Sequence, residues 1–437
     1  MPQFIRKIMA FELHFTLIFF SLFSVSSFTF PLPPILPRFP SSIVSAELKQ
    51  RSHSAPNTPY KTKFFTQILD HFNFNPQSNH VFQQRYLIND TFWGGAKNNA
   101  PIFVYTGNEG NIEWFTQNTG FMFENAPSFH ALLLFIEHRF YGKSIPFGGN
   151  RKVAYANATT LGYLSSTQAL ADYATLIIDL KKNLSATDSP VVVFGGSYGG
   201  MLAAWFRMKY PHVAIGALAS SAPILHFMDL VSPDIFNSII SQDFRMCEAI
   251  EGTKKEKNDE LEKLYAAVSV FYNHTGTATC FDLDDDSDPH DLGGWQWQAC
   301  TEMIMPVGGS NKHSIFPEYK WSYEDRESAC QFFYNVTPRP HWITTEFGGH
   351  AIQTVLKSSA SNIIFFNGLR DPWSGGGVLK NISKSIVALV EKRGAHHVDL
   401  RYSTKEDPKW LKDVRRQEVN IIASWISQYY QDLHSNN

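Results

Sequence analysis

The sequence predicts an α/β protein with a mostly parallel sheet, and three features lead to this expectation. Short, continuous apolar runs of strand length alternate with segments of helical periodicity. One of these runs ends in a Gly-x-Ser-x-Gly turn and is followed at once by a helical pattern. The 437 residues are 43% hydrophobic, which is enough to bury a large core. Alternating strands and helices are typical of parallel sheets covered by helices on both faces.

Composition excludes several functional classes. Lys and Arg number 38 against 40 Asp and Glu, and this near-neutral balance argues against a dedicated nucleic-acid-binding protein. Only four cysteines occur in this long chain, so it is not a small disulfide scaffold. The 16 histidines show no spacing typical of metal ligands. We therefore predict no metal, no other cofactor and no nucleic-acid partner.

The N-terminus predicts entry into the secretory pathway. Residues 1–27 combine a basic start, an apolar stretch and small residues, which is the order of a signal peptide. The apolar stretch is shorter than the roughly 20 residues of a spanning helix, so we expect no membrane anchor after cleavage. Residues 28–58 are rich in Pro and Ser and are interpreted as a flexible leader or propeptide.

Six Asn-x-Ser/Thr sequons agree with this route, whose expected end is the lysosome or vacuole, or the extracellular space. The six predicted glycosylation sites are Asn89, Asn157, Asn183, Asn273, Asn335 and Asn381.

The predicted domain falls into two parts of the chain. Residues 59–224 contain four apolar runs that we interpret as strands and two helical patterns: strands 101–106, 132–137, 190–194 and 213–219, and helices 166–184 and 201–210. Residues 361–437 add two strands and a C-terminal helix: strands 362–366 and 386–390, and a helical stripe from Leu411 to Tyr429. Between them, residues 225–360 break the alternation with a charged helix at 254–272, the acidic run 282–288 and all four cysteines. This middle segment is predicted to be an inserted, mainly helical cap.

The turn Gly195-Gly196-Ser197-Tyr198-Gly199 fits the pattern Gly-x-Ser-x-Gly. It lies between the apolar run PVVVF and a helical pattern, and this is the context in which a nucleophilic serine sits at a sharp turn. Flanking glycines leave room for a strained backbone, and the helix N-terminus points free N–H groups at the hydroxyl. The alternative is a Gly-rich phosphate-binding turn. We predict that Ser197 is a nucleophile.

A serine hydroxyl needs a base, and this type of sheet places the acid and the base later in the chain, in the order Ser, Asp or Glu, His. Asp371 follows one predicted strand, and His396 and His397 follow the next, so all three should reach the same edge as Ser197. The residues alone leave open which histidine is the base. Asp399 is a rival acid, but it is too close in sequence to the histidines to reach them from a neighbouring strand.

An oxyanion hole needs two backbone donors. The N–H of Tyr198 is one by its position after the serine. The second is expected in the loop after the strand at 101–106, from Gly107 or Asn108. Glu109 lies in the same loop, where its carboxylate could bind a substrate amine or simply fix the loop.

The segments that carry these residues resemble the S28 serine peptidases: YTGNEG, TGFM, EHRFYGKSIPFG, FGGSYGGMLAAWFRMKYPH, ACTEM, PRPxW, NGLRDPWSGGG and GAHHVDLR. The resemblance covers most of residues 60–430. It implies an α/β-hydrolase fold with a helical cap and exopeptidase cleavage next to proline. By motif position it makes Ser197 the nucleophile, Asp371 the acid and His396 the base.

Within that family, the phrases WFTQNTGFM and AAWFRMKYPH look more like the branch that removes a C-terminal residue from peptides ending in Pro-Xaa. The expected partners are therefore peptides that contain proline. An apolar, aromatic slot suits a proline ring, which has no N–H. We expect Met201, Trp373 and Met305 to form its walls, and ordinary core packing is the alternative for each.

The chain departs from the family in its cap. The segment that usually follows a SQDF-like sequence is short here, because DFRMCEAIEG leads directly into a charged helix. The resemblance pairs Cys300 with Cys330 in a disulfide. Cys247 and Cys280 match positions whose partners would fall in the missing stretch, so they either pair with each other or stay free. A shortened cap could open the cleft or expose apolar surface.

Two rival functions remain at this stage. One is a dipeptidyl peptidase II-like enzyme that releases N-terminal dipeptides. The other is a catalytically silent, cap-deficient interaction protein. A lipase or esterase is disfavoured by the family segments. A homodimer is compatible with the sequence.

Overall fold

The computed structural model describes residues 60–435, apart from 75–79, 243–244, 254–259, 274–275, 277–291, 311–313 and 315. The predicted signal peptide and leader, the acidic run 282–288 and Cys280 lie outside the described residues.

An eight-stranded sheet organises the described part of the chain, with the strand order β1-β2-β4-β3-β5-β6-β7-β8. The two hairpin strands β1 and β2 run antiparallel to their neighbours, and all later pairs are parallel. The strands are β1 (Lys61–Ile68), β2 (Val81–Asn89), β3 (Ile102–Thr106), β4 (Leu132–Ile136), β5 (Val191–Gly196), β6 (Gly216–Ser220), β7 (Ile363–Gly368) and β8 (Ile386–Glu391). This mostly parallel sheet confirms the predicted fold class.

All six predicted strands are present, but the sequence did not predict the hairpin β1–β2. Strand β1 lies at the edge of the sheet and is largely exposed, so it has no continuous apolar run. Strand β2 buries the polar side chains of Gln84 and Arg85 completely. The Arg85 guanidinium donates to the buried carboxylate of Glu137, with Nη2 at 2.5 Å from Oε1. A polar strand that is satisfied by distant partners carries no apolar signal.

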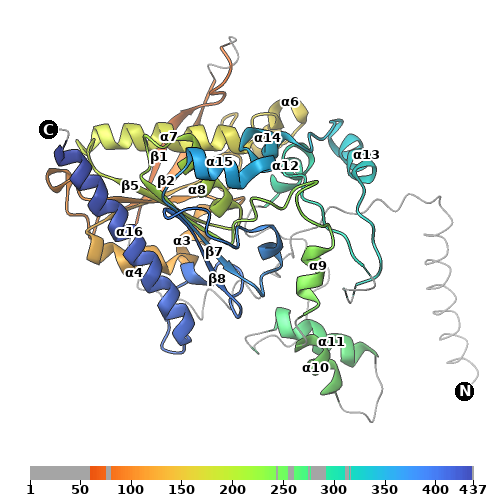
Figure 1. Cartoon of the computed structure of the whole chain (residues 1–437). Helices are drawn as coiled ribbons and strands as arrows, with labels where there is room; N and C mark the ends of the chain where they lie inside the picture. Colours follow the sequence, from red (N-terminus) through yellow and green to blue (C-terminus); the bar gives the residue numbers. More distant parts are fainter. Residues whose placement is uncertain are drawn as a thin grey trace, which may run out of the picture.

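Helices cover both faces of the sheet (Figure 1). The α-helices are α3 (Ile112–Asn118), α4 (Gly120–Phe129), α5 (Arg151–Ala154), α6 (Ala158–Leu161), α7 (Ser166–Asn183), α8 (Tyr198–Lys209), α9 (Ile235–Ile240), α10 (Arg245–Glu251), α11 (Glu260–Tyr272), α12 (Trp295–Thr301), α13 (Tyr323–Tyr334), α14 (Trp342–Glu346), α15 (Ile352–Ser359) and α16 (Lys409–Ser435). The 3-10 helices are η2 (Ala96–Asn98), η3 (Gly349–Ala351), η4 (Pro372–Gly376) and η5 (Val398–Leu400). Among the described helices, none is long and apolar enough to cross a membrane.

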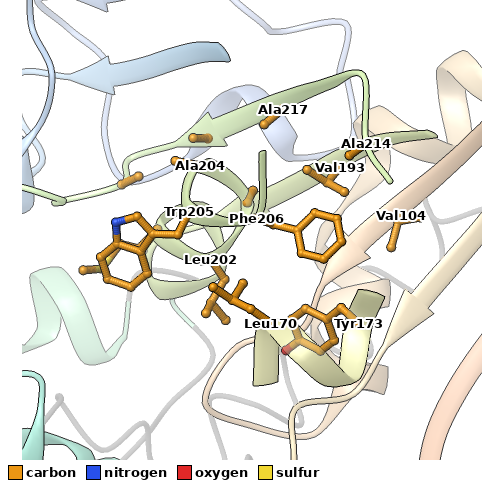
Figure 2. Packing of buried hydrophobic residues seen from close by; sticks show 14 of the residues in the cluster. Val104, Leu170, Tyr173, Val193, Leu202, Ala204, Trp205, Phe206, Ala214 and Ala217 are labelled. Atoms are coloured by element: carbon orange, nitrogen blue, oxygen red, sulfur yellow. The ribbon is translucent and has the colours of Figure 1, made fainter. Parts of the chain in front are cut away.

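The core has two layers, one on each face of the sheet. Ile102 and Val104 of β3 point into the layer formed with α7 and α8, while Phe103 and Tyr105 point into the layer formed with α3, α4 and α16. Figure 2 shows the first layer, with the phenyl ring of Phe206 among side chains of β3, β5 and α7. Strands buried on both faces read as continuous apolar runs, which is why the sequence predicted them.

The segment between β6 and β7 is mainly helical in its described residues and divides into two kinds of structure. Helices α10 and α11 pack against each other. Helices α12, α14 and α15 instead join the core of the sheet, where Phe347 stacks on Trp205 of α8 at a ring-centroid distance of 4.2 Å. The treatment of residues 225–360 as one separate cap therefore stays a prediction.

A disulfide joins α12 to α13, as predicted: Cys300 and Cys330 are bonded, with Cα atoms 5.5 Å apart. Cys247 on α10 is an exposed free thiol.

Candidate active site

Ser197 stands at the sharp turn between β5 and α8. Its backbone has φ 59° and ψ −127°, a combination that an L-residue other than glycine rarely adopts. Its N–H donates to the carbonyl of Ser220 at 3.0 Å, and its carbonyl accepts the N–H of Met201 at 3.0 Å. These bonds hold the turn between the neighbouring strand β6 and the first turn of α8. The local geometry is that of a nucleophile elbow.

Two glycines of the motif are required by close backbone contacts. A Cβ atom on Gly195 would lie 2.0 Å from the carbonyl oxygen of Gly199. A Cβ atom on Gly199 would lie 2.1 Å from the side-chain oxygen of Asn108. Larger residues would therefore push the elbow apart, and this is the physical reason for the Gly-x-Ser-x-Gly pattern.

Asp371 and His396 meet at the same edge of the sheet. The Nδ1 atom of His396 lies 2.7 Å from Oδ2 of Asp371, which is buried. The other oxygen of Asp371 accepts the N–H of Trp373 at 3.0 Å, so the carboxylate is fixed at the start of η4. The side chain of His396 is 33% exposed. Its carboxylate contact fixes the ring through Nδ1 and leaves Nε2 for chemistry.

His397 makes different contacts from its neighbour. Its N–H donates to the hydroxyl of Ser221 at 2.9 Å, and its ring would be 3.0 Å from a Cβ atom on Gly196. Burial, followed by the positive charge of His396, lowers the pKa of His397 well below its ordinary value. A neutral ring packed beneath the elbow has the structural role that the sequence expected of one of the two histidines.

The loop after β3 contributes Asn108 to the elbow. Its side-chain Nδ2 donates to the carbonyl of Gly196 at 2.7 Å, and its Oδ1 accepts the hydroxyl of Tyr105 at 2.9 Å. Among the described residues, nothing accepts the Asn108 backbone N–H. The N–H of Gly107, in contrast, donates to the carbonyl of Ile136 at 3.0 Å. The prediction of Gly107 as an oxyanion donor is therefore wrong, because its N–H already donates to the carbonyl of Ile136.

Glu109 is 8% exposed, and its Oε2 atom is buried without a hydrogen-bond partner among the described residues. Burial raises the pKa of Glu109 to about 7, although the positive charge of His396 lowers it in part. The carboxyl group therefore lies within the electrostatic reach of His396, and it can hold a proton at mildly acidic pH.

The three predicted pocket walls differ in how much surface they present. Met201 is 1% exposed and belongs to the core, as does the buried Met305. Trp373 is only partly buried, and its indole packs edge-on against Phe236 and His226. Core packing explains the two methionines, so Trp373 is the residue of this set that we retain as a candidate pocket wall.

Sequence reasoning missed a buried polar network behind the elbow. The Tyr198 hydroxyl accepts from Nε2 of Gln298 at 2.9 Å and lies 3.1 Å from Nε2 of His138. Glu302 accepts from Gln298 and from the N–H and hydroxyl of Ser166. Burial raises the pKa of Glu302 to about 7. These residues lie far apart in the chain, and no spacing in the sequence connects them.

The predicted glycosylation sites divide by exposure. Asn89 is 2% exposed at the end of β2, and its side chain accepts the N–H of Thr91, so the folded chain has no room for a glycan there. The remaining sequon asparagines are exposed or partly exposed: Asn157, Asn183, Asn273, Asn335 and Asn381. In the described residues, no group of three or more His, Cys, Asp or Glu side chains is placed to hold a metal ion.

A serine on a strained turn between β5 and α8 is followed along the chain by a hydrogen-bonded Asp–His pair in the loops after β7 and β8 of the same parallel sheet. The fold and this order of residues place the protein among the serine hydrolases with an α/β-hydrolase fold.

The chain belongs to the serine carboxypeptidase S28 family, whose sequence profile matches residues 67–254 and 236–418. Lysosomal Pro-X carboxypeptidase of Bos taurus is 37% identical over 492 aligned residues, which cover 93% of this chain and 96% of the bovine protein. The Homo sapiens protein of the same name is 36% identical, with 85% and 89% covered. The Caenorhabditis elegans prolyl carboxy peptidase like protein 5 is 32% identical, with 84% and 90% covered. The protein is therefore a serine-type peptidase.

The alignment with the bovine relative shows that this chain lacks some of the relative's segments. The bovine alignment, at 492 residues, is longer than this whole chain of 437 residues. The bovine protein therefore contains segments that have no counterpart here. The two matches of the family profile overlap at residues 236–254, inside the segment that the sequence predicts to be shortened.

Proposed function

We propose that this protein is a serine exopeptidase that removes the C-terminal residue from peptides ending in Pro-Xaa. The observation that carries the proposal is the Asp371–His396 hydrogen bond at the edge where Ser197 is held in strained geometry. Membership of the serine carboxypeptidase S28 family and the Pro-X carboxypeptidase relatives support the substrate class. The Bos taurus and Homo sapiens relatives are named lysosomal. We therefore propose an acidic compartment of the secretory pathway as the location of this protein.

The proposed reaction passes through an acyl-enzyme. The Ser197 oxygen attacks the carbonyl carbon of the proline residue while His396 Nε2 takes the hydroxyl proton. The N–H groups of Asn108 and Tyr198 would stabilise the oxyanion. The C–N bond then breaks, and His396 gives the proton to the leaving amine. Water, deprotonated by the same histidine, releases the proline-ended peptide, and Asp371 keeps the imidazole in its tautomer throughout.

Glu109 favours this direction of cleavage over the release of N-terminal dipeptides. An enzyme that acts at the N-terminus must hold a protonated amine with an ionised carboxylate. Because burial raises the pKa of Glu109 to about 7, this group is largely neutral at mildly acidic pH and offers little counter-charge. We propose that Glu109, in its neutral form, lines the site near His396.

Three matched peptides test the proposal. One ends in Pro-Xaa, one ends in Ala-Xaa, and one ends in Pro-Xaa with an amidated terminus. The proposal predicts loss of the last residue from the first peptide alone, at mildly acidic pH. A fluorophosphonate that labels the native protein but not Ser197→Ala would establish the nucleophile. Equal cleavage of the Ala-Xaa peptide would contradict the proline preference, and an unlabelled, folded protein would contradict the catalytic role of Ser197.

A further inference from the structure

Two carboxyl groups, those of Asp399 and Glu418, are buried side by side beneath the active edge. Each residue is 0% exposed. Glu418 lies one helical turn after Arg415 on α16, and the Arg415 guanidinium donates to the carbonyl of Asp399, which places the two carboxyl groups near each other. No N–H or O–H of the described residues donates to either oxygen of Glu418 or to Oδ2 of Asp399. Two neighbouring carboxylates that are buried and lack donors repel each other, so burial favours a proton on at least one of them.

The charged groups around the pair leave it short of positive charge. Arg415, one turn earlier on α16, is the cation that acts on both carboxyl groups. Its guanidinium is shared, because it also donates to Asp407 at 2.5 Å and to the backbone carbonyls of residues 398, 399 and 401. A single guanidinium that already pairs with Asp407 cannot also neutralise two buried carboxylates.

The remaining titratable neighbours add no compensation. His397 lies in the same loop and stays neutral, because burial lowers its pKa. Arg401 donates to Asn118 of α3. Glu124 of α4, a helix that contacts both α16 and η5, accepts from Ser403 at the surface. Strand β6 contributes no charged side chain. Accordingly, burial raises the pKa of Asp399 to about 6, and burial and the charge of Asp399 raise the pKa of Glu418 well above its ordinary value.

The pair is connected to the catalytic residues by short steps. The Ser220 hydroxyl donates to Oδ1 of Asp399 at 2.5 Å. The carbonyl of the same Ser220 accepts the N–H of the nucleophile Ser197. The next residue, Ser221, accepts the N–H of His397 through its hydroxyl. Asp399 itself follows the histidines by only a few residues. Helix α16 is thus joined through Glu418 and Asp399 to both the elbow and the histidine loop.

We propose that Glu418 and Asp399 form a proton-dependent latch, in which a shared proton holds Ser220 and the histidine loop in the active arrangement, and its loss releases them. Glu418 is in this view a positioning residue that confines activity to acidic pH. The inference rests on the proposed function where activity is the readout, and on the fold alone where stability is the readout.

The sign of the pH effect follows from the raised pKa values. A carboxyl group whose pKa is higher in the folded than in the unfolded chain stabilises the fold fully below its unfolded pKa of about 4. That contribution is lost as the pH rises through the folded values, about 6 for Asp399 and higher for Glu418. Stability and activity should therefore fall together from mildly acidic towards alkaline pH.

The variant Glu418→Gln tests the latch, since its carboxamide has the shape of a protonated carboxyl and donates to Asp399 at every pH. We expect an unchanged unfolding temperature at about pH 5, and a pH of half-maximal loss of activity and of stability that moves upward by about one unit or more. Asp432→Asn is the matched control, because it removes an exposed carboxylate from the same helix and should follow the native profile. Glu109 and Glu302 titrate in both proteins, so their contributions cancel when the pH profile of the variant is compared with that of the native protein.

The same pH of half-maximal loss in the native protein and in Glu418→Gln would overturn the latch. Asp399→Asn provides a second variant, because its amide can donate to Glu418 and its oxygen can still accept from Ser220. If neither variant folds at about pH 5, the neutral form is not what the fold needs, and the latch is wrong. Absence of Pro-Xaa cleavage by the native chain would count against the proposed function instead, and the unfolding temperatures would still decide the latch.

Discussion

The strands beneath the active edge and the outer helices of the insertion are built in opposite ways. Every residue of β5 is buried, and its neighbours β3 and β6 are equally enclosed. Helix α11, in contrast, exposes Leu261 and Leu264 and packs on α10. Tight burial on both faces fixes the backbone that carries Ser197, whereas α10 and α11 contribute little to it. Burial is thus complete in the strand that leads to Ser197, whereas α10 has no buried residue.

The second part of residues 225–360, from α12 to α15, packs against the sheet and its helices. Phe347 of the insertion stacks on Trp205 of α8, and the disulfide ties α12 to α13. Glu302 of the same half reaches Ser166 at the start of α7. The division between helices that pack on the sheet and helices that pack on each other thus runs through residues 225–360 and does not coincide with the ends of that segment.

The largest effect is expected at the catalytic edge. Asp371→Asn should lower kcat by about 10⁴-fold, because the amide no longer holds His396 in the tautomer that can accept a proton. The unfolding temperature should change little, which steady-state kinetics and thermal unfolding together would show. Asp188→Asn, at an exposed position, is the matched control. Activity within tenfold of native would mean that Asp371 is not the orienting acid.

Shortening a buried side chain in the part of residues 225–360 that packs on the sheet should cost nearly as much unfolding free energy as shortening one in the sheet. Phe347→Ala should cost about 3–5 kcal/mol of unfolding free energy, since it leaves a cavity against Trp205. Phe332→Ala should stay within about 0.5 kcal/mol, because Phe332 is 72% exposed whereas Phe347 is 2% exposed. Urea unfolding measures both variants. Equal losses for the two would place the boundary elsewhere.

The outer helices should matter for association more than for stability. Changing Leu261 and Leu264 to Ser together should alter the unfolding free energy by no more than about 1 kcal/mol. The same change should reduce self-association at high concentration, because it removes exposed apolar surface. Sedimentation velocity over a range of concentrations is the measurement. Loss of the folded state in this variant would show that α11 supports the sheet after all.

The smallest effect is expected at the sequons. Peptide mapping by mass spectrometry of protein from a secretory host should find no glycan on Asn89, which is buried, and glycan on exposed sequons such as Asn335. Asn335→Gln should change the unfolding free energy by about 0.5 kcal/mol or less. An occupied Asn89 in active protein would contradict the buried end of β2.

Much of the fold and the catalytic edge could be predicted from local signals. The strands β3 to β7 are buried on both faces and therefore read as apolar runs, β8 is an apolar run that is only partly buried, and the elbow has its own glycine pattern. The edge hairpin carried no such signal, since β1 is exposed and β2 buries an arginine that Glu137 satisfies.

Long-range polar contacts were beyond the sequence. The sequence suggests only a catalytic role for Asp399, because its contacts with Ser220 and Arg415 come from other elements. The position of Gly107 in a loop predicts a free amide, and the sequence does not reveal that this amide donates to the carbonyl of Ile136. The choice between His396 and His397 came from the family resemblance, and it agrees with the observed contact of His396 with Asp371.

The direction of cleavage and the role of Ser197 can be measured together on one substrate. A single peptide with proline both next to last and second is incubated at mildly acidic pH, with Ser197→Ala as the control, and the products are read by mass spectrometry. We expect loss of the last residue by the native protein and no product from the variant. Release of an N-terminal dipeptide, or no cleavage by a folded sample, would contradict it.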